Sequence, residues 1–119
     1  MEKTILIDGK EVRMRASALV PRYYRFKFGR DIVVDLRKLS EKMFKGYQDG
    51  GEDEGFSAMD LTIFEDVAYT MAKQADPSIP ETPEEWLDSF NIFAIYEILP
   101  EILLLWEESK QTTAVQKKK

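Results

Sequence analysis

Apolar and polar residues alternate at the start of the chain and recur at helical spacing further along. The segments KTILI (3–7) and EVRMR (11–15) flank Asp8-Gly9, a dipeptide that tolerates the positive φ angles of a two-residue type I′ turn. This turn would pair Ile5 with Val12 and place the apolar residues of both segments on one face. We therefore predict an antiparallel β-hairpin, whose apolar face must lie on helices because an isolated hairpin is marginal in water.

The stretch PRYYRFKFGRD, residues 21–31, combines four aromatic rings with four basic side chains. The apolar positions at helical spacing are Val20, Tyr23, Tyr24 and Phe28, and we expect Val20, Tyr24 and Phe28 to be core. Ser17 is a suitable cap before this helix, and Gly29 is a natural stop after it.

A second helix is expected from a cap at Asp31 to about Phe44, and residues 46–55, with four glycines and four acids, indicate a surface loop. A third begins with a capping box of Ser57 and Asp60 and ends at Asp76-Pro77. A fourth helix is expected to start at Thr82. Helix resumes from residue 91, and Pro100 must kink or divide it near Leu99.

These elements indicate an α+β fold, mostly α, in which an N-terminal β-hairpin packs on a bundle of about five helices. We expect a single domain over residues 1–110 and a disordered basic tail over 111–119, which lacks apolar periodicity.

Composition argues against most enzyme chemistry. The chain has no His, which is the commonest general base and metal ligand. It also has no Cys, which supplies thiol nucleophiles and thiolate metal ligands. No calcium-loop spacing is present in 46–55, and no Gly-rich phosphate loop occurs. We expect no catalytic, cofactor or metal residues. The chain also shows no apolar run long enough to span a membrane and no secretory h-region.

Charge is unevenly distributed. Residues 10–45 carry eleven Lys or Arg against four acids, whereas residues 46–110 carry sixteen acids against two lysines. Such a split predicts self-association by contact between opposite faces, with two solvated faces as the alternative.

Residues 92–106 are dominated by large apolar side chains. Their number exceeds what a single buried face of a helix requires. The surplus predicts a surface for a protein partner, with a fully buried central helix as the alternative. Arg22, Arg25 and Arg30 would form a polar face for acids of the same chain or of a neighbour. The predicted protein-binding residues are Arg22, Arg25, Arg30, Ile95, Leu99, Ile102, Leu103 and Trp106.

The quoted basic and aromatic stretch also suits nucleic acid, since arginines could meet phosphates while Tyr23 or Phe26 stacks on bases. A small nucleic-acid-binding regulator using residues 10–45 is therefore an alternative, although we expect no nucleic-acid partner because acids dominate the rest of the chain.

Over residues 4–110, the order IDGKEV, PRYYRFKFGRDIVVDL, EDVAYTMAKQADPSIPETPEEWLDSF and ILPEILLLW resembles the tail assembly chaperones of long-tailed (siphovirus-type) phages and prophages of Gram-positive bacteria. The resemblance implies a non-enzymatic factor that binds the tape measure protein and keeps it soluble during tail morphogenesis. It implies action in the host bacterial cytoplasm and absence from the mature virion, with the tail tube protein as a further partner. A structural head–tail connector is the remaining alternative.

Many such chaperones are also made in a frameshifted long form. The resemblance therefore raises the expectation that Lys117–Lys119 lie on a slippery run of adenines and that 111–119 serve as a linker.

Overall fold

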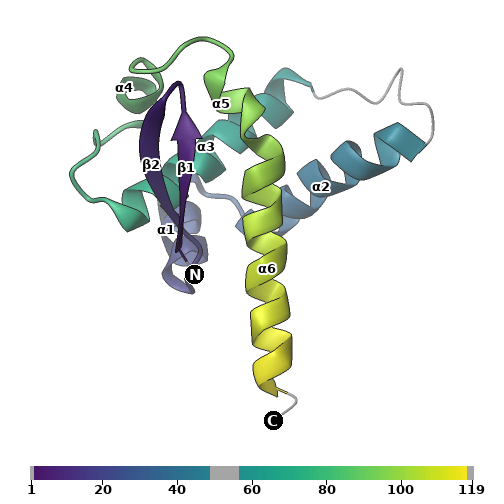
Figure 1. Ribbon diagram of the computed structural model, residues 1–119. Coiled ribbons are helices and arrows are strands. Elements are labelled where there is room, and N and C mark those ends of the chain that lie inside the picture. The colour runs from purple at the N-terminus through teal and green to yellow at the C-terminus, as the bar shows by residue number, and fades with distance from the viewer. Residues whose placement is uncertain (1, 49–56, 118–119) are drawn as a thin grey trace.

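The computed structural model describes residues 2–48 and 57–117, with the side chains of 2–43 and 57–108. The fold is α+β and mostly α, as predicted (Figure 1). Its elements are β1 (Glu2–Ile7), β2 (Lys10–Arg15), α1 (Leu19–Phe28), α2 (Ile32–Gln48), α3 (Ala58–Ala75), α4 (Pro83–Leu87), α5 (Ala94–Glu97) and α6 (Leu99–Lys117).

The β-hairpin has the predicted register. Ile5 pairs with Val12, and the turn residues Asp8 and Gly9 have φ angles of 55° and 76°, which a type I′ turn requires. Ile5, Ile7 and Met14 are buried on one face, as the alternation indicated.

Two hydrogen bonds tie the hairpin turn to the segment between α4 and α5. The Asp8 carboxylate accepts from the backbone N–H of Asn91 at 3.1 Å, and Lys10 Nζ donates to the carbonyl of Ser89 at 2.7 Å. These hydrogen bonds therefore hold the β-hairpin against a segment about eighty residues later in the sequence.

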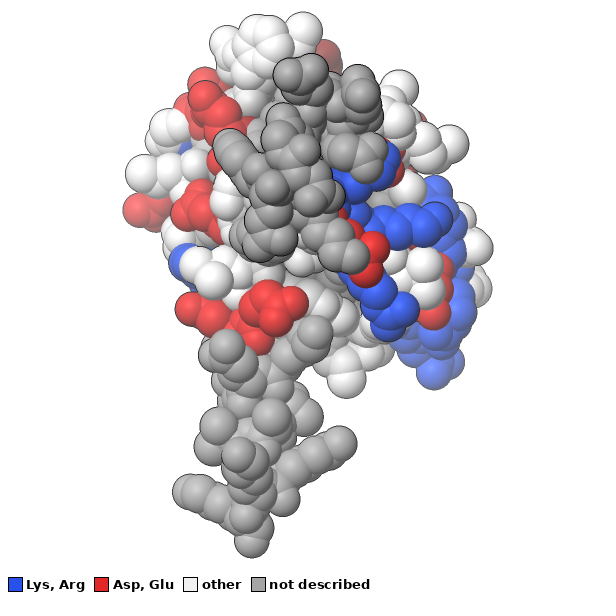
Figure 2. Space-filling model, turned by 90° about the vertical axis from the view of Figure 1, so that its right-hand side faces the viewer, with Lys and Arg blue, Asp and Glu red and all other residues white. Residues whose placement is uncertain are grey.

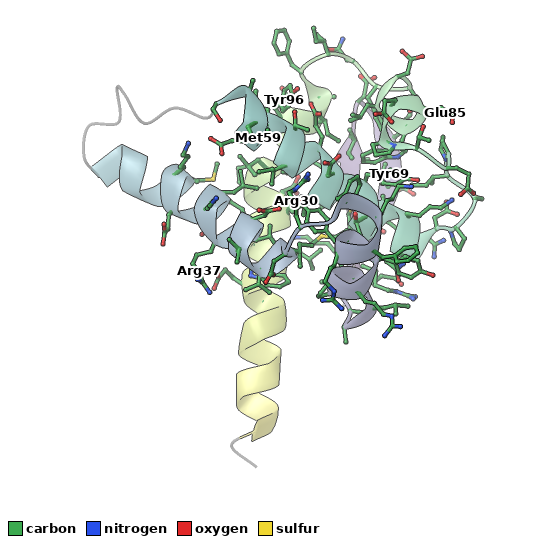
Figure 3. All side chains as sticks on the ribbon, turned by 180° about the vertical axis from the view of Figure 1, so that it is seen from behind. Arg30, Arg37, Met59, Tyr69, Glu85 and Tyr96 are labelled. Carbon is green, nitrogen blue, oxygen red and sulfur yellow. The ribbon has the colours of Figure 1, made fainter. Side chains whose placement is uncertain are left out.

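Helix α3 lies at the centre of the molecule. It contacts β2, α1, α2 and α4, and opposite views show the hairpin on one side of it and α1 on the other (Figures 1 and 3). The predicted capping box is present at its start: Ser57 Oγ accepts from the Asp60 N–H at 3.1 Å, and the Asp60 carboxylate accepts from the Ser57 N–H at 2.9 Å. Asp60 also accepts from Lys42, which joins α2 to α3.

The turn between α1 and α2 follows the predicted stop and start. Gly29 adopts the left-handed region with φ of 70°, and its N–H donates to the Arg25 carbonyl at 2.8 Å. The Asp31 carboxylate accepts from the Val33 N–H at 2.9 Å at the start of α2. Helix α2 continues to Gln48, so the predicted loop starts later than residue 46. Its residues 49–55 lie outside the described part.

One prediction for the start of α1 needs correction. Ala18, rather than Ser17, precedes α1, although the Ser17 hydroxyl still accepts from the Leu19 N–H at 3.3 Å. Tyr23, which was one of the apolar positions at helical spacing but was not expected in the core, is half exposed, because the buried side of α1 is filled by Val20 and Tyr24.

The C-terminal helical region divides as expected. A short α5 ends at Glu97, and Pro100 lies in the first turn of α6, where a missing N–H costs no helical bond. Helix α6 then runs to Lys117 and projects beyond the other elements (Figure 1). Residues 111–117 thus belong to α6, and no Pro or Gly there stops the helix. Residues 118 and 119 lie outside the described part.

Candidate functional site

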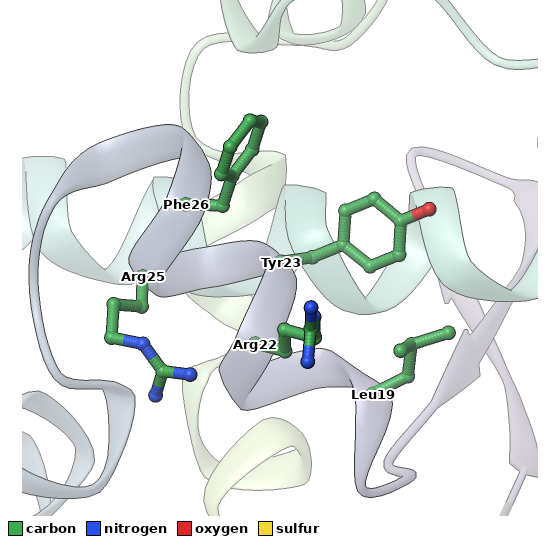
Figure 4. A pocket seen from close by; sticks show the side chains of 5 residues that line it. All are labelled: Leu19, Arg22, Tyr23, Arg25 and Phe26. Carbon is green, nitrogen blue, oxygen red and sulfur yellow. The ribbon is translucent and has the colours of Figure 1, made fainter.

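The outer side of α1 carries large side chains that the fold does not bury. Leu19, Tyr23 and Phe26 are 47%, 50% and 88% exposed. Their spacing of four and three residues places them along one side of the helix. Figure 4 shows them on the ribbon of α1 together with Arg22 and Arg25. We call these five residues the α1 outer face.

The α1 outer face lines a hollow of about 560 Å³. Arg22 and Arg25 are exposed within it, and neither forms an ion pair with any residue that the structure describes. The face therefore combines apolar contact area with positive charge that no ion pair among the described residues neutralises.

The opposite side of α1 holds the helix firmly in the core. Val20 and Tyr24 are buried there, and the Tyr24 and Phe28 rings pack with their centroids 5.2 Å apart. Burial of one side and exposure of the other make α1 a rigid support for the outer face.

A polar network beneath α1 fixes its orientation. Tyr24 Oη donates to Asp35 Oδ2 at 2.7 Å, and Arg30 Nε donates to the same oxygen at 3.1 Å. Arg30 Nη2 donates to Tyr24 Oη at 3.0 Å and to Asp66 Oδ2 at 2.7 Å. The network therefore links α1, the following turn, α2 and α3.

Burial shapes the protonation of this network. It raises the pKa of Tyr24, and the hydrogen bond to Asp35 acts in the same direction. It also raises the pKa of Asp66, although the hydrogen bond from Arg30 opposes the change. Arg30 thus serves as the counter-charge of two buried carboxylates.

The three arginines predicted as one polar face consequently have different roles in the fold. Arg22 and Arg25 lie on the α1 outer face. Arg30 lies inward among α1, α2 and α3, as its label in Figure 3 shows, and pairs with Asp66 of the acidic half of the chain.

The apolar residues predicted to bind a partner lie mainly in the core. Ile95, Leu99, Ile102 and Leu103 are buried, and Trp106 is partly buried against them. In this structure they form no exposed surface with Arg22 and Arg25. Leu104 is the large apolar residue of α6 that faces outward within residues 99–108.

The exposed residue Leu19 was missed as a site candidate, and Phe26 was considered only for stacking on nucleic-acid bases. A signal was present, because Leu19, Tyr23 and Phe26 form a second apolar stripe in a helix whose first stripe is Val20, Tyr24 and Phe28. A ten-residue helix on the surface can bury only one of two such stripes.

A smaller hollow of about 260 Å³ lies between the hairpin and α4, lined by residues that include Lys10, Arg13, Asp76 and Phe90. Lys10 is already used there, since it donates to Ser89 and lies 5.4 Å from the centroid of the Phe90 ring.

No helix within residues 2–48 and 57–117 combines the length and apolar character needed to cross a membrane. The same residues contain no group of three or more acidic side chains placed to hold a metal ion.

Comparisons of the chain with protein-family models, with curated proteins and with solved structures give no match.

Proposed function

We propose that this protein is a tail assembly chaperone of a long-tailed phage or prophage, which binds the tape measure protein and keeps it soluble during tail morphogenesis. The observation that carries the proposal is the α1 outer face, where Leu19, Tyr23 and Phe26 remain exposed on a helix anchored by its other side. The proposal also rests on the resemblance of residues 4–110 to this class of chaperone.

The chemistry of the α1 outer face suits a client that is helical and apolar. Clustered exposed apolar side chains mark interaction surfaces in soluble proteins, and a helix face can hold a second helix along its length. Covering Phe26 would remove its ring from water, and a client helix would shield its own apolar residues in the same contact. We propose binding without catalysis, because the chain has neither His nor Cys.

The proposed setting is the host bacterial cytoplasm. The tape measure protein is the main partner, the tail tube protein is a further one, and copies of the chaperone associate with each other. We expect the chaperone to leave before the virion is complete.

Co-expression with the tape measure protein encoded nearby tests this function. We expect the wild-type chain to raise the soluble fraction of the tape measure protein and to co-purify with it. The double variant Tyr23→Ala, Phe26→Ala should lose both effects. Leu6→Ala is the matched control, because Leu6 is also a large exposed apolar residue but lies on the hairpin. An unchanged, insoluble tape measure protein would contradict the proposal.

Purified virions supply a second test of the same function. A chaperone should be absent from them by mass spectrometry, whereas a head–tail connector would be present in fixed copy number.

One observation favours a second candidate, a nucleic-acid-binding regulator. Exposed Tyr23 and Phe26 rings stand beside exposed Arg22 and Arg25, which is the combination that binds single strands by stacking and phosphate contact. A gel-mobility assay at low salt would show retardation of a single-stranded oligonucleotide that disappears at high salt.

A further inference from the structure

The α1 outer face carries a charge pattern as well as an apolar stripe. Arg22 and Arg25 lie beside Leu19, Tyr23 and Phe26, and all five line the same hollow (Figure 4). In a helix, residues at these spacings form an apolar stripe with the two guanidinium groups beside it.

Neither arginine is neutralised within the described residues, whereas the neighbouring cations on α1 and its following turn are engaged. Lys27 donates to the Glu81 carbonyl at 3.2 Å, and Arg30 pairs with Asp35 and Asp66. Positive charge is therefore left over at the apolar stripe itself, and a partner covering the stripe must accommodate two guanidinium groups.

We propose that the α1 outer face binds an acidic amphipathic helix, one whose apolar residues recur at three- and four-residue spacing and are flanked by Glu or Asp. This inference rests on the proposed function and names the class of client segment that the face selects. Carboxylates at the flanks of the client would meet Arg22 and Arg25 while its apolar side covers Phe26 and Tyr23.

The dimensions agree with a short contact. The ten residues of α1 span about 15 Å at a rise of 1.5 Å per residue. A partner helix packed along α1 would therefore contribute about three turns, with apolar residues at one position, three or four residues later, and seven residues later.

Two synthetic peptides of about 20 residues, long enough to be helical, supply the probe. Each repeats a heptad with Leu at two positions. One has Glu at the flanking positions, and its twin has Lys at the same positions. Fluorescence anisotropy of labelled peptide measures binding to the full chain at about 0.01 M and about 1 M salt, where the Debye length is roughly 30 Å and 3 Å.

We expect the wild-type chain to bind the Glu peptide about tenfold more tightly than the Lys peptide at low salt, and the preference to fall at high salt. The double variant Arg22→Glu, Arg25→Glu should reverse the preference, and Phe26→Ala should weaken binding of both peptides. The matched control is Arg37→Glu, Lys38→Glu. It makes the same change of charge at exposed positions on α2, where Figure 3 labels Arg37 away from α1, and it should keep the preference.

Equal binding of the two peptides, or a preference that survives the double reversal, would overturn the inference. The comparison of the Glu peptide with the Lys peptide uses the wild-type chain, so it tests the inference even where a variant fails to fold. Tighter binding of a single-stranded oligonucleotide at the same two arginines would assign the face to nucleic acid and would also overturn it.

The co-expression experiment separates this inference from the proposed function. If the tape measure protein becomes soluble but the chain binds both peptides equally, the acidic-helix inference is wrong and the proposed function stands. If the tape measure protein stays insoluble but the chain clearly prefers the Glu peptide, the proposed client is wrong and the acidic-helix specificity is supported.

Discussion

At the scale of single residues, Arg30 is a partly buried cation that pairs with two buried carboxylates. Its guanidinium group bridges Asp35 and Asp66, and its centre lies 5.3 Å from the centroid of the Tyr24 ring. Removing one member of such a network leaves the others buried without a counter-charge. Arg30 therefore belongs to the fold, whereas Arg22 and Arg25, five to eight positions earlier, belong to the surface.

Tyr24 and Phe26 give a direct test of which side of α1 is buried. Tyr24→Ala should lower the free energy of unfolding by about 3–5 kcal/mol, because it removes a fully buried aromatic side chain. Phe26→Ala should change it by no more than about 0.5 kcal/mol, since the ring is exposed. Urea unfolding of both variants measures the two values. Similar losses for both would show that the orientation of α1 described above is wrong.

Asp60 makes stability depend on pH. Burial alone would raise the pKa of Asp60, but hydrogen bonds from Lys42 and Ser57 outweigh it and hold the pKa below its ordinary value. The folded state then binds a proton less readily than the unfolded state, so the carboxylate stabilises the fold above pH of about 4. This contribution is lost as the pH falls further, through the folded-state pKa.

The variant Asp60→Asn tests this dependence because it keeps the side-chain shape and removes the charge. Its melting temperature should lie below that of the wild type at pH 7, and the difference should shrink below pH of about 4. A difference that stays constant from pH 7 to pH 3 would contradict the role assigned to the Asp60 carboxylate.

At the scale of elements, the joint between α1 and α2 depends on one backbone conformation. A Cβ at Gly29 would meet no atom within 4 Å, so the cost of adding one comes from the φ angle of 70° alone. Gly29→Ala should therefore lower stability by about 1–2 kcal/mol. Gly29→Asn should cost less, because Asn adopts the left-handed region more readily. Thermal melts rank the two variants, and equal stability of all three chains would contradict the prediction.

The elements that could be predicted from sequence are those whose signals are local. The Asp8-Gly9 turn, the Ser57 capping box and the Gly29 stop are each decided by a few adjacent residues, and the structure confirms all three. The burial of Ile102 and Leu103 was not predictable in this way. Helix α6 is apolar on more than one side, so its buried face depends on where the other elements lie.

The candidate site illustrates the same limit. Tyr23 and Tyr24 are adjacent and chemically identical, yet one is half exposed and the other is buried. Helical periodicity places them on neighbouring sides of α1, but the contact with α3 decides which side is covered. The exposed stripe could therefore be assigned only after the packing of α1 was known.

At the scale of the whole molecule, opposite charges lie apart on the face that Figure 2 draws as well as along the chain. Figure 2 shows Lys and Arg side chains gathered at one edge, while Asp and Glu lie mostly toward the other. The exposed basic residues of α1 and α2 include Arg22, Arg25, Arg37 and Lys38, and the exposed acids of α4 to α6 include Glu84, Glu85, Glu97 and Glu101.

This separation predicts salt-sensitive self-association of the chain through opposite faces. Sedimentation velocity at high protein concentration should show a larger average mass at low salt than at about 1 M salt, where screening shortens the Debye length to roughly 3 Å. The variant Arg22→Glu, Arg25→Glu should reduce the low-salt mass, because it removes charge from the basic side. A monomer under both conditions would contradict the prediction and leave the chaperone proposal standing.

The hydrogen bond between the hairpin turn and Asn91 has a consequence for folding during translation. The hairpin can form once residue 15 has left the ribosome, but its partners in α3 and at residues 89–91 emerge later. At about 5–20 residues per second, the wait for residue 91 lasts roughly 4–15 s. Until α3 has also emerged, Ile5, Ile7 and Met14 lack the helix that packs on the hairpin. The hairpin is thus synthesised seconds before the elements that cover it, and in every round of translation its apolar face is exposed to the surroundings of the nascent chain for that time.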